Sequence, residues 1–411
     1  MTTPDPLPDD LREDLHDLYR HLHAHPELSG SEYATAALVS ERMRALGYTV
    51  RTCAGTGVVA TLTRGDGPAV AFRADIDALP LPEETGLPYA STDRGTLPDG
   101  SDVPVMHACG HDTHITCAIG AATLLALDTD GWRGSVVFLF QPAEETAAGA
   151  AAMVKDGVWD KALPDGRRPE VVYGQHVWPA RAGTIDIAPG PAMSRADAWK
   201  VTVHGRGGHG SRPETTIDPV VLTAYMIVRI QSIVSREVAA QSPAVITVAT
   251  VRAGLKENII PGTAEFTINV RTLDDDVRDR VLAALRRVIR AEAEASGAPE
   301  PDIEELYVFP LLANDEALTA QAVEVLTAEL GEGRVGYVPA SMGSEDFGHL
   351  PQAIDAPGVY WHFGGTADEV MDSAGPVPSN HSPRYAPVLE PTLTTGVRAA
   401  YAVLRHRLTP A

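Results

Sequence analysis

The stretch AVAFRAD at residues 69–75 is the most informative part of the chain for the fold class. Apolar side chains stand at consecutive positions instead of alternate ones, which predicts a strand that is covered on both faces. Similar short apolar runs occur at residues 58–62, 136–140, 171–174 and 359–363, and helical patterns lie between them. Buried strands separated by helices predict an α/β domain whose central sheet is mixed, largely parallel and flanked by helices.

The middle of the chain has a different pattern, which begins near Ala198. We expect a strand, a helix, two strands, a helix and a strand there, at residues 199–204, 219–237, 244–252, 264–272, 274–296 and 303–308. This β-α-β-β-α-β order is typical of an α+β, ferredoxin-like domain. Since strand–helix alternation resumes after Pro310, residues 191–309 are predicted to be inserted into a first domain formed by residues 1–190 and 310–411.

The composition limits the classes of function. The formal net charge of -22 at pH 7 argues against binding to nucleic acid or to an anionic membrane, because both require a basic surface. No run of about 18 apolar residues predicts a membrane span, and the first residues lack the basic flank and apolar run of a signal peptide. The three cysteines are too few for a disulfide framework. We therefore expect a cytoplasmic protein without nucleic-acid or membrane partners.

Candidate metal ligands are concentrated in MHACGHDTH at residues 106–114, where three histidines, a cysteine and an aspartate fall within nine positions. Cys109 and His111 lie in a glycine-containing loop before a helix that we expect to begin near Thr113. A helix N-terminus favours a thiolate, and thiolate, imidazole and carboxylate groups are the ligands of zinc-like divalent metals. The stretch therefore predicts part of a metal site.

Further polar residues are expected just past the ends of buried strands, at Asp75, Glu144, Glu145 and His176. In open α/β sheets the functional crevice lies at this edge. Any one of these residues alone is best explained as a loop carboxylate or a hydrogen-bonded histidine, but their joint placement favours a site. The adjacent pair Glu144 and Glu145 suggests that one carboxylate binds metal while the other is a general base, with a solvated acidic turn as the alternative.

Other residues in these motifs have simpler interpretations. Cys117 falls on an apolar helical stretch and is expected to be an inert buried thiol. His107 and His114 are expected to support the ligands or to be ordinary hydrogen-bonded histidines. The stretch GRGGHG at residues 205–210 matches a dinucleotide-binding pattern, but no helix begins at its third glycine, and Arg252 ends the next strand where an acidic residue is required. We therefore expect no dinucleotide site.

Several motifs along nearly the whole chain resemble the aminoacylase/carboxypeptidase family of two-metal peptidases. Within that family the sequence is similar to the amidohydrolase branch of hippurate hydrolases, N-acyl-amino-acid amidohydrolases and auxin-conjugate hydrolases. The motifs that carry the resemblance are HPELS at 25–29, RADIDALP at 73–80, HACGHD at 107–112, QPAEE at 141–145, GHGSRP at 208–213, NIIP at 258–261 and MGSEDF at 342–347.

The resemblance implies a catalytic domain and an inserted lid domain that usually carries a dimer interface. It also implies two divalent metal ions, zinc or manganese, with cobalt or nickel as alternatives. By motif, Cys109 takes the position that bridges the two metals. His111 and His176 complete one metal site. Glu145 and His381 complete the other.

The remaining roles are also implied by motif. Glu144 matches the family's general base, and Asp75 matches its supporting aspartate. Arg73 is a departure, because other branches have a metal-binding histidine at this position; His111 is expected to supply the missing ligand.

Four residues of the later motifs are implied to act on the substrate. His209 matches a histidine that, in dimeric relatives, reaches into the partner's active site and stabilises the oxyanion. Asn258 and Arg271 match residues that hold the substrate, since a guanidinium suits a carboxylate; for Arg271 a surface arginine is the alternative. The turn at Gly343 is expected to offer backbone donors near the site.

The resemblance implies hydrolysis of the amide bond of N-acyl-L-amino acids, with an N-acetyl, N-benzoyl or similar acyl group. Glu144 is expected to take the proton of the attacking water and deliver it to the leaving amine while the lid closes. A dipeptidase or carboxypeptidase of the same fold is the first alternative, and a non-catalytic metal-binding protein is the second. We expect a homodimer or a higher homo-oligomer that forms through the lid domain.

Overall fold

The computed structural model describes residues 7–409, which fall into two compact units. The larger unit, here called the sheet unit, contains the chain up to Ala192, the segment Ala313–Pro339 and the chain from Asp346 onward. The smaller unit, here called the inserted unit, contains Met193–Leu312 and the short segment Ala340–Glu345.

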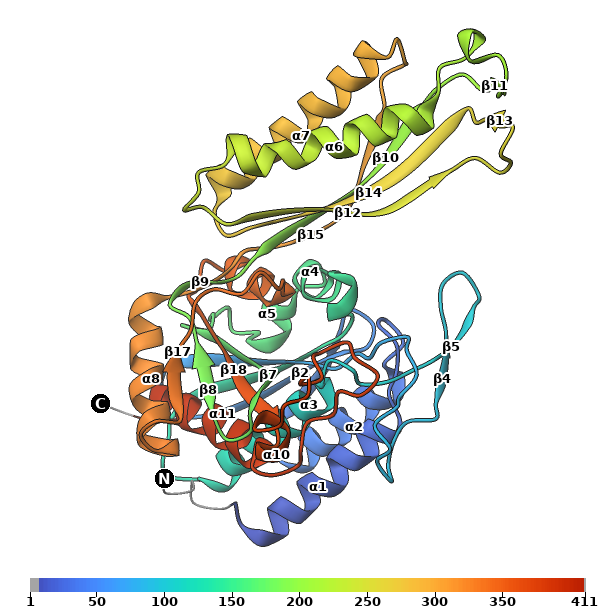
Figure 1. Ribbon diagram of the computed structural model, residues 1–411. Helices are drawn as coiled ribbons and strands as arrows, with labels where there is room; N and C mark the ends of the chain where they lie inside the picture. The colour runs from blue at the N-terminus through green and yellow to red at the C-terminus, as the bar shows by residue number, and fades with distance from the viewer. Residues whose placement is uncertain (1–6, 410–411) are drawn as a thin grey trace. The chain divides into compact units, whose positions relative to one another are not determined.

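The sheet unit is built on one eight-stranded sheet (Figure 1). Its strands, in spatial order, are β1 (Thr49–Cys53), β2 (Gly57–Arg64), β6 (Gly134–Gln141), β3 (Ala69–Asp75), β7 (Val172–Arg181), β18 (Gly358–Thr366), β8 (Ile185–Ile187) and β17 (Val335–Tyr337). Neighbours from β6 to β18 are parallel, as are β8 and β17, whereas the other pairs are antiparallel. The predicted mixed, largely parallel sheet is confirmed. The stretch AVAFRAD forms β3, and every residue of it is buried.

Helices cover both faces of this sheet (Figure 1). One layer consists of α1 (Asp9–Ala24), α2 (Tyr33–Ala45), α3 (His111–Leu127), α8 (Glu316–Leu330) and α11 (Thr392–Leu408). The opposite face carries the shorter helices α4 (Gly149–Lys155) and α5 (Val158–Ala162). α3 packs against α1, α2, α11 and the sheet, so nearly all of its side chains are buried. A helix enclosed in this way needs no polar face.

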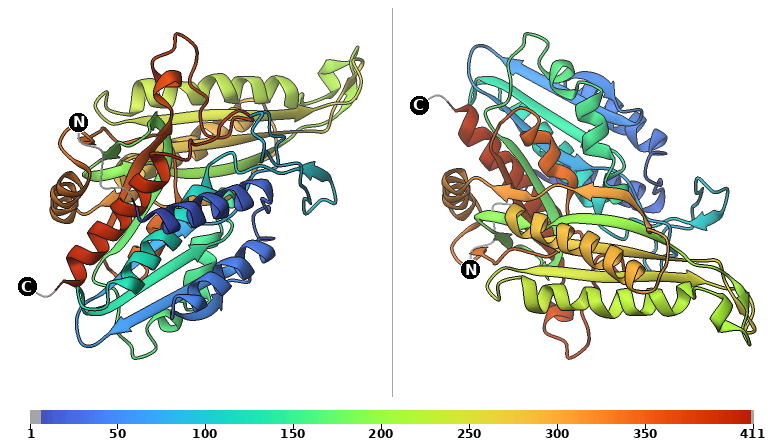
Figure 2. Two further views of the ribbon diagram at one scale, coloured as in Figure 1. Left: turned by 90° about the horizontal axis from the view of Figure 1, so that it is seen from below. Right: turned by 90° about the horizontal axis from the view of Figure 1, so that it is seen from above.

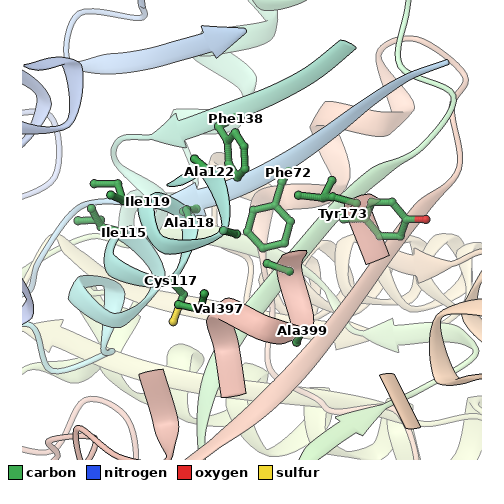
Figure 3. Close-up of a cluster of buried hydrophobic side chains, with 14 of the residues drawn as sticks. Phe72, Ile115, Cys117, Ala118, Ile119, Ala122, Phe138, Tyr173, Val397 and Ala399 are labelled. Atoms are coloured by element: carbon green, nitrogen blue, oxygen red, sulfur yellow. The ribbon is translucent and has the colours of Figure 1, made fainter. Parts of the chain in front are cut away.

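Figure 3 shows the core between the sheet and the helix layer that contains α3 and α11. Phe72 of β3, Phe138 of β6 and Tyr173 of β7 pack towards α3 and α11, where Ile119 and Val397 belong to the same buried cluster. Each such side chain contributes roughly 1.5–3 kcal/mol when it is fully buried. The core therefore fixes the central strands and the N-terminus of α3 relative to one another.

Short elements lie in the connections. In the sheet unit they are β4 (Arg94–Thr96), β5 (Asp102–Pro104), η1 (Glu144–Thr146), η3 (Asp346–Gly348), α9 (His349–Gln352) and α10 (Asp368–Met371). The strands β9 (Gly190–Met193) and β16 (Leu312–Asn314) lie where the chain passes between the units. Among residues 7–409, no helix combines the length and the apolar character needed to cross a membrane.

The inserted unit has a four-stranded antiparallel sheet with two helices side by side on one face (Figure 2). In spatial order the strands are β12 (Ala244–Ala253), β14 (Thr263–Thr272), β10 (Arg195–His204) and β15 (Asp302–Phe309). The helices are α6 (Pro219–Glu237) and α7 (Asp275–Ala295), and each begins after an aspartate whose carboxylate accepts from backbone N–H groups of the first turn. The chain order is the predicted ferredoxin-like order, β10-α6-β12-β14-α7-β15.

The segment Ala340–Glu345 clusters with the inserted unit, although the sequence pattern assigns it to the first domain. The Arg271 guanidinium of β14 donates to the Met342 carbonyl at 2.7 Å and to Ser344 Oγ at 3.2 Å. The backbone N–H of Ser194 also donates to the Gly343 carbonyl at 2.8 Å. These contacts join residues that lie far apart in the sequence, which periodicity cannot predict.

Candidate metal centre

Several of the candidate site residues come from the ends of central elements of the sheet unit. β3 ends at Asp75, and β6 ends at Gln141, shortly before the single turn η1 that carries Glu144 and Glu145. β3 and β6 are parallel neighbours, so their carboxyl ends lie at the same edge of the sheet. α3 begins at His111, two residues earlier than expected, so its first residue contributes to the site.

His176 differs from the prediction in one respect, because it lies inside a strand. β7 continues to Arg181 and pairs with β18 along this stretch. His176 Nδ1 donates to the Val177 carbonyl at 2.6 Å, and its Nε2 lies 3.4 Å from Cys109 Sγ. The Nδ1 contact fixes the tautomer, so the Nε2 lone pair is directed towards the thiol.

A second set of ligand atoms also includes Cys109. His381 Nε2 lies 3.3 Å from Glu145 Oε1, and ligand atoms of Cys109, Glu145 and His381 are all within 4.8 Å of one another. The His381 backbone, with a φ of 66°, donates to the Ala108 carbonyl at 2.8 Å, which holds it beside the cysteine loop. Cys109 thus contacts both sets, and a bridging ligand needs such a position.

His111 stands between the two carboxylates at the strand ends. Its Nδ1 donates to the Asp77 carbonyl at 2.9 Å, while its Nε2 is buried and has no hydrogen-bond partner. Nε2 lies 3.5 Å from Asp75 Oδ2 and 3.9 Å from Glu145 Oε1. A buried imidazole nitrogen without a hydrogen-bond partner, facing carboxylates, is an arrangement that a cation would complete.

His114 and Asp75 lie near these atoms but are already occupied. His114 Nδ1 contacts Asp75 Oδ1, and His114 Nε2 accepts from the Val177 backbone N–H at 2.8 Å. Asp75 Oδ2 accepts from Arg73 Nη1 at 2.8 Å. Because both nitrogens of His114 have protein partners, it supports the site and does not offer a lone pair to a metal.

Glu144 and Glu145 occupy different surroundings although they are adjacent. The Glu145 N–H donates to Asp77 Oδ2 at 3.1 Å, and its buried Oε1 has no hydrogen-bond partner. Glu144 is 6% exposed, and one of its carboxylate oxygens lies within 4.8 Å of ligand atoms of His111 and Glu145. This turn is therefore not the solvated acidic turn that was the alternative interpretation.

The electrostatics of the centre favours a cation. Burial, and then the charges of Glu145 and Glu144, raise the pKa of the Cys109 thiol well above its ordinary value. Burial alone would lower the pKa of His111, but nearby carboxylates, Asp75 foremost, raise it to about 10. The carboxylates therefore hold a proton where a metal would bind, and a bound ion would replace that proton and deprotonate the thiol. The donor set fits a divalent metal.

In the inserted unit the short strands β11 (Gly208–His209) and β13 (Ile259–Ile260) pair antiparallel; His209 lies on β11, and Asn258 directly precedes β13. His209 is exposed, and its Nδ1 accepts from Ser211 Oγ at 2.8 Å. The Asn258 carbonyl accepts from the Gly210 N–H at 2.8 Å. The structure brings these two residues together, and their roles stay predictions.

Arg271 and Gly343 also lie together in the inserted unit. Arg271 is half-buried, and its Nε donates to Asn269 Oδ1 at 3.0 Å in addition to its contacts with residues 342 and 344. The Gly343 N–H donates to Ser341 Oγ at 3.0 Å. The backbone donor expected at Gly343 is thus engaged inside its own turn.

The comparisons with known proteins agree with this geometry. Residues 71–406 match the family described as Peptidase family M20/M25/M40. The chain belongs to this family. It is 37% identical to the N-acetyl-L-cysteine deacetylase of Bacillus subtilis (strain 168) over 361 residues, which covers 87% of this chain and 82% of that protein. It is 36% identical to thermostable carboxypeptidase 2 of Saccharolobus solfataricus over 388 residues, which covers 92% of each.

A solved structure extends the comparison with the M20 family. A Bacillus subtilis protein described as a dinuclear metal binding peptidase of that family superposes with a TM-score of 0.78 at 30% identity, covering 98% of this chain and 99% of that chain. Together with the ligand clusters, family membership makes this protein a dinuclear-metal hydrolase of the amidohydrolase and peptidase type. The resemblance of the sequence motifs to the two-metal peptidase family is confirmed.

Two residues of this M20 centre were not singled out from the sequence. Asp77 accepts from His111 and from the Glu145 N–H, and its Oδ2 also accepts from Ser29 Oγ at 2.6 Å. Asn380 Nδ2 donates to the Cys109 carbonyl at 3.2 Å. Signals existed for both, since Asp77 follows β3 in the motif at 73–80 and Asn380 precedes His381, but only contacts reveal their roles.

Proposed function

We propose that this M20-family hydrolase cleaves the amide bond of N-acyl-L-amino acids, such as N-acetyl or N-benzoyl derivatives, to a carboxylic acid and an amino acid. The observation that carries the proposal is the buried Glu144 carboxylate beside the donor atoms of His111 and Glu145. A general base next to a divalent metal centre suits amide hydrolysis. Similarity to an N-acetyl-L-cysteine deacetylase over most of the chain supports the acyl amino-acid class.

Five side chains would hold the two divalent metal ions. Cys109 is shared, His111 and His176 complete one set, and Glu145 and His381 complete the other. These nitrogen, oxygen and sulfur donors suit Zn²⁺ or Mn²⁺, with Co²⁺ and Ni²⁺ as alternatives. When bound, such ions would polarise the scissile carbonyl and lower the pKa of the attacking water.

Glu144 moves the proton in the proposed reaction. Its carboxylate accepts a proton from the water that attacks the carbonyl carbon. It then gives this proton to the amide nitrogen, so the carbon–nitrogen bond breaks and the amine leaves neutral. Asp75 does not touch the reacting atoms in this scheme; it holds Arg73 and His114 in place.

The inserted unit is proposed to act as a lid and to carry the dimer interface. His209 would stabilise the oxyanion in the partner's active site, while Asn258 and Arg271 would hold the substrate carboxylate and Gly343 would help to shape the site. Exposed apolar side chains on α6, Tyr225 at 63% and Val228 at 73%, support an interface on this unit.

The proposed location is a reducing compartment, the cytoplasm. Cys53, Cys109 and Cys117 are all free thiols. A thiol that has to bind metal as a thiolate keeps that ability only when it is not oxidised. The proposed partner of the site is a small-molecule substrate.

A carboxypeptidase or dipeptidase is the second candidate function. It is supported by the 36% identity to a thermostable carboxypeptidase over 92% of the chain. Both candidates use the same metal centre and the same base. They differ in what lies on the acyl side of the scissile bond, since a peptide adds a backbone and a free amine there.

A substrate panel with the metal-loaded protein separates the two functions. We expect N-acetyl- and N-benzoyl-L-amino acids to be hydrolysed with kcat/KM at least about tenfold above that of dipeptides and C-terminally extended peptides. Metal analysis of the same sample would check the loading, and Glu144→Gln would control for contaminating hydrolases. Preference for peptides would establish the second candidate. A fully loaded protein that hydrolyses neither class would overturn both.

A further inference from the structure

We propose that Arg73 is a positioning residue of the metal centre. It acts through Asp75 and His114 on Val177, the residue that holds the His176 imidazole. The inference rests on the proposed role of His176 as a ligand, and it concerns residues that touch neither substrate nor the reacting atoms.

Arg73 lies entirely inside the sheet unit, between two carboxylates. Its Nη1 donates to Asp75 Oδ2 at 2.8 Å, its Nη2 to Asp346 Oδ1 at 3.1 Å and its Nε to Gln141 Oε1 at 2.9 Å. The side chains of Arg73, Asp75 and Asp346 are 0% exposed. Asp346 also accepts from the Ala150 N–H at 3.0 Å. A buried guanidinium with this many partners is held in one orientation.

The next step of the path runs from Asp75 to His114. The Val177 N–H can only donate, so His114 Nε2 must accept and the proton of the neutral ring must lie on Nδ1. That Nδ1–H then donates to Asp75 Oδ1. Arg73 and His114 therefore occupy one oxygen each of Asp75, and the tautomer of His114 follows from its partners.

Val177 connects the path to the ligand. Its N–H is held by His114, and its carbonyl accepts from His176 Nδ1 at 2.6 Å. The same carbonyl lies 3.4 Å from Asn380 Nδ2. With Nδ1 fixed in this way, His176 Nε2 faces Cys109 Sγ at 3.4 Å. Residues that fix the orientation of a ligand typically change metal affinity when they are altered.

The charge of Arg73 also decides what Asp75 can do. Asp75 Oδ2 lies 3.5 Å from His111 Nε2, the nitrogen that has no hydrogen-bond partner. As long as Arg73 donates to this oxygen, the Asp75 carboxylate stays oriented between Arg73 and His114. Without Arg73, Asp75 would be left as a buried, unbalanced negative charge beside this nitrogen.

The test is a double-mutant cycle on metal affinity, with Zn²⁺ and Mn²⁺ titrated against a chromophoric chelator. We expect Arg73→Lys and His114→Gln each to weaken binding about 10- to 100-fold. The double variant should bind metal only slightly more weakly than the single variant with the lower affinity, because both substitutions interrupt the same path. Arg405→Lys is the control, since it alters an arginine–aspartate pair between α11 and the residue after α3 (Arg405 Nε to Asp128 Oδ2, 2.7 Å) and should leave metal affinity unchanged.

Wild-type affinity in the folded single variants, or effects that multiply in the double variant, would overturn the proposal. His114→Gln leaves the buried charges intact, so wild-type affinity in this variant would overturn the proposal even if Arg73→Lys unfolds. Urea unfolding of all variants separates a loss of stability from a loss of metal. Since no substrate is involved, failure of the proposed substrate class leaves this result standing, and the substrate panel is equally independent of Arg73.

Discussion

At the scale of single residues, two adjacent carboxylates on a single turn have different surroundings, and the proposed function gives them different tasks for that reason. Glu145 has its backbone held by Asp77 and one carboxylate oxygen aimed at His111 and His381. Glu144 is buried and lies close to ligand atoms of His111 and Glu145. Neighbouring residues on a tight turn cannot present their carboxylates to a metal in the same way, which is why we propose that one of them binds metal and the other moves the proton.

The first prediction follows from this division. Glu144→Gln should keep its full metal content but lower kcat by roughly 10²–10⁴-fold, because the amide can neither accept nor deliver the proton. Glu145→Gln should instead lose metal from one site. Steady-state kinetics and metal analysis of the two purified variants check this. The reverse pattern, with metal lost in Glu144→Gln, would show that the two roles are exchanged.

A second prediction concerns the shared thiol. Cys109 contacts His176 on one side and lies within the group formed with Glu145 and His381 on the other. Cys109→Ser should therefore weaken both metal sites together, since a neutral hydroxyl is a much poorer ligand than a thiolate. Metal titration followed by calorimetry gives the two affinities. A change confined to one of them would reject the bridging role.

At the scale of elements, a buried histidine joins α1 to the start of α3. His23 Nδ1 lies 2.6 Å from Asp112 Oδ2, and His23 Nε2 lies 3.0 Å from Glu83 Oε1, with all three side chains 0% exposed. Burial alone would lower the pKa of His23, but the hydrogen bonds to Asp112 and Glu83 raise it from 6.5 to about 10. The cation on α1 thus balances two carboxylates next to the metal-binding loop.

A pH dependence of stability follows, and its sign is fixed by the raised pKa. The folded state binds one proton more than the unfolded state between pH 6.5 and about 10, so this stabilisation is complete below pH 6.5 and is lost as the pH rises towards 10. His23→Gln should lower the free energy of unfolding by about 3–5 kcal/mol at pH 6, the usual cost of breaking a buried pair. The deficit should shrink towards pH 10.

Urea unfolding of wild type and variant at pH 6, 8 and 10 measures this deficit. His16→Gln, on the same helix and in a partly exposed contact with Glu390, controls for the replacement of a helical histidine. A deficit that is the same at all three pH values would contradict the buried cation.

The elements also show how far the sequence alone can lead. Continuous apolar runs predicted β3, β6 and β18, because a strand that is buried on both faces needs apolar side chains at consecutive positions. Periodicity did not predict that β7 continues past His176, since its later residues are only half-buried. Periodicity also could not assign Ala340–Glu345 to the inserted unit, because that placement depends on contacts with the distant Arg271. Nor could it single out Asp77, whose side chain contacts a residue 68 positions away.

At the scale of the whole molecule, the question is whether one chain contains a complete active site. The proposed metal ligands all lie in the sheet unit, whereas His209, Asn258 and Arg271 lie in the inserted unit. His209 is exposed on a short two-stranded element, and within residues 7–409 no carboxylate forms an ion pair with its ring. An exposed histidine of this kind is free to serve a neighbouring subunit.

The last prediction tests a shared active site by complementation. Removal of an oxyanion donor costs roughly 10²–10³-fold in rate, and removal of the general base roughly 10²–10⁴-fold. His209→Ala and Glu144→Gln should therefore each be nearly inactive. After subunit exchange, half of the dimers are mixed. If His209 acts in the partner, each mixed dimer has one site with both residues intact, and about a quarter of wild-type activity should return. If it acts within its own chain, every site in the mixture lacks one of the two residues and no activity returns.

Size-exclusion chromatography with light scattering must show dimers, and exchange of labelled subunits must be demonstrated first. A fully active monomer, or no recovery after proven exchange, would exclude the shared site, and full activity of His209→Ala alone would remove the histidine from the reaction altogether.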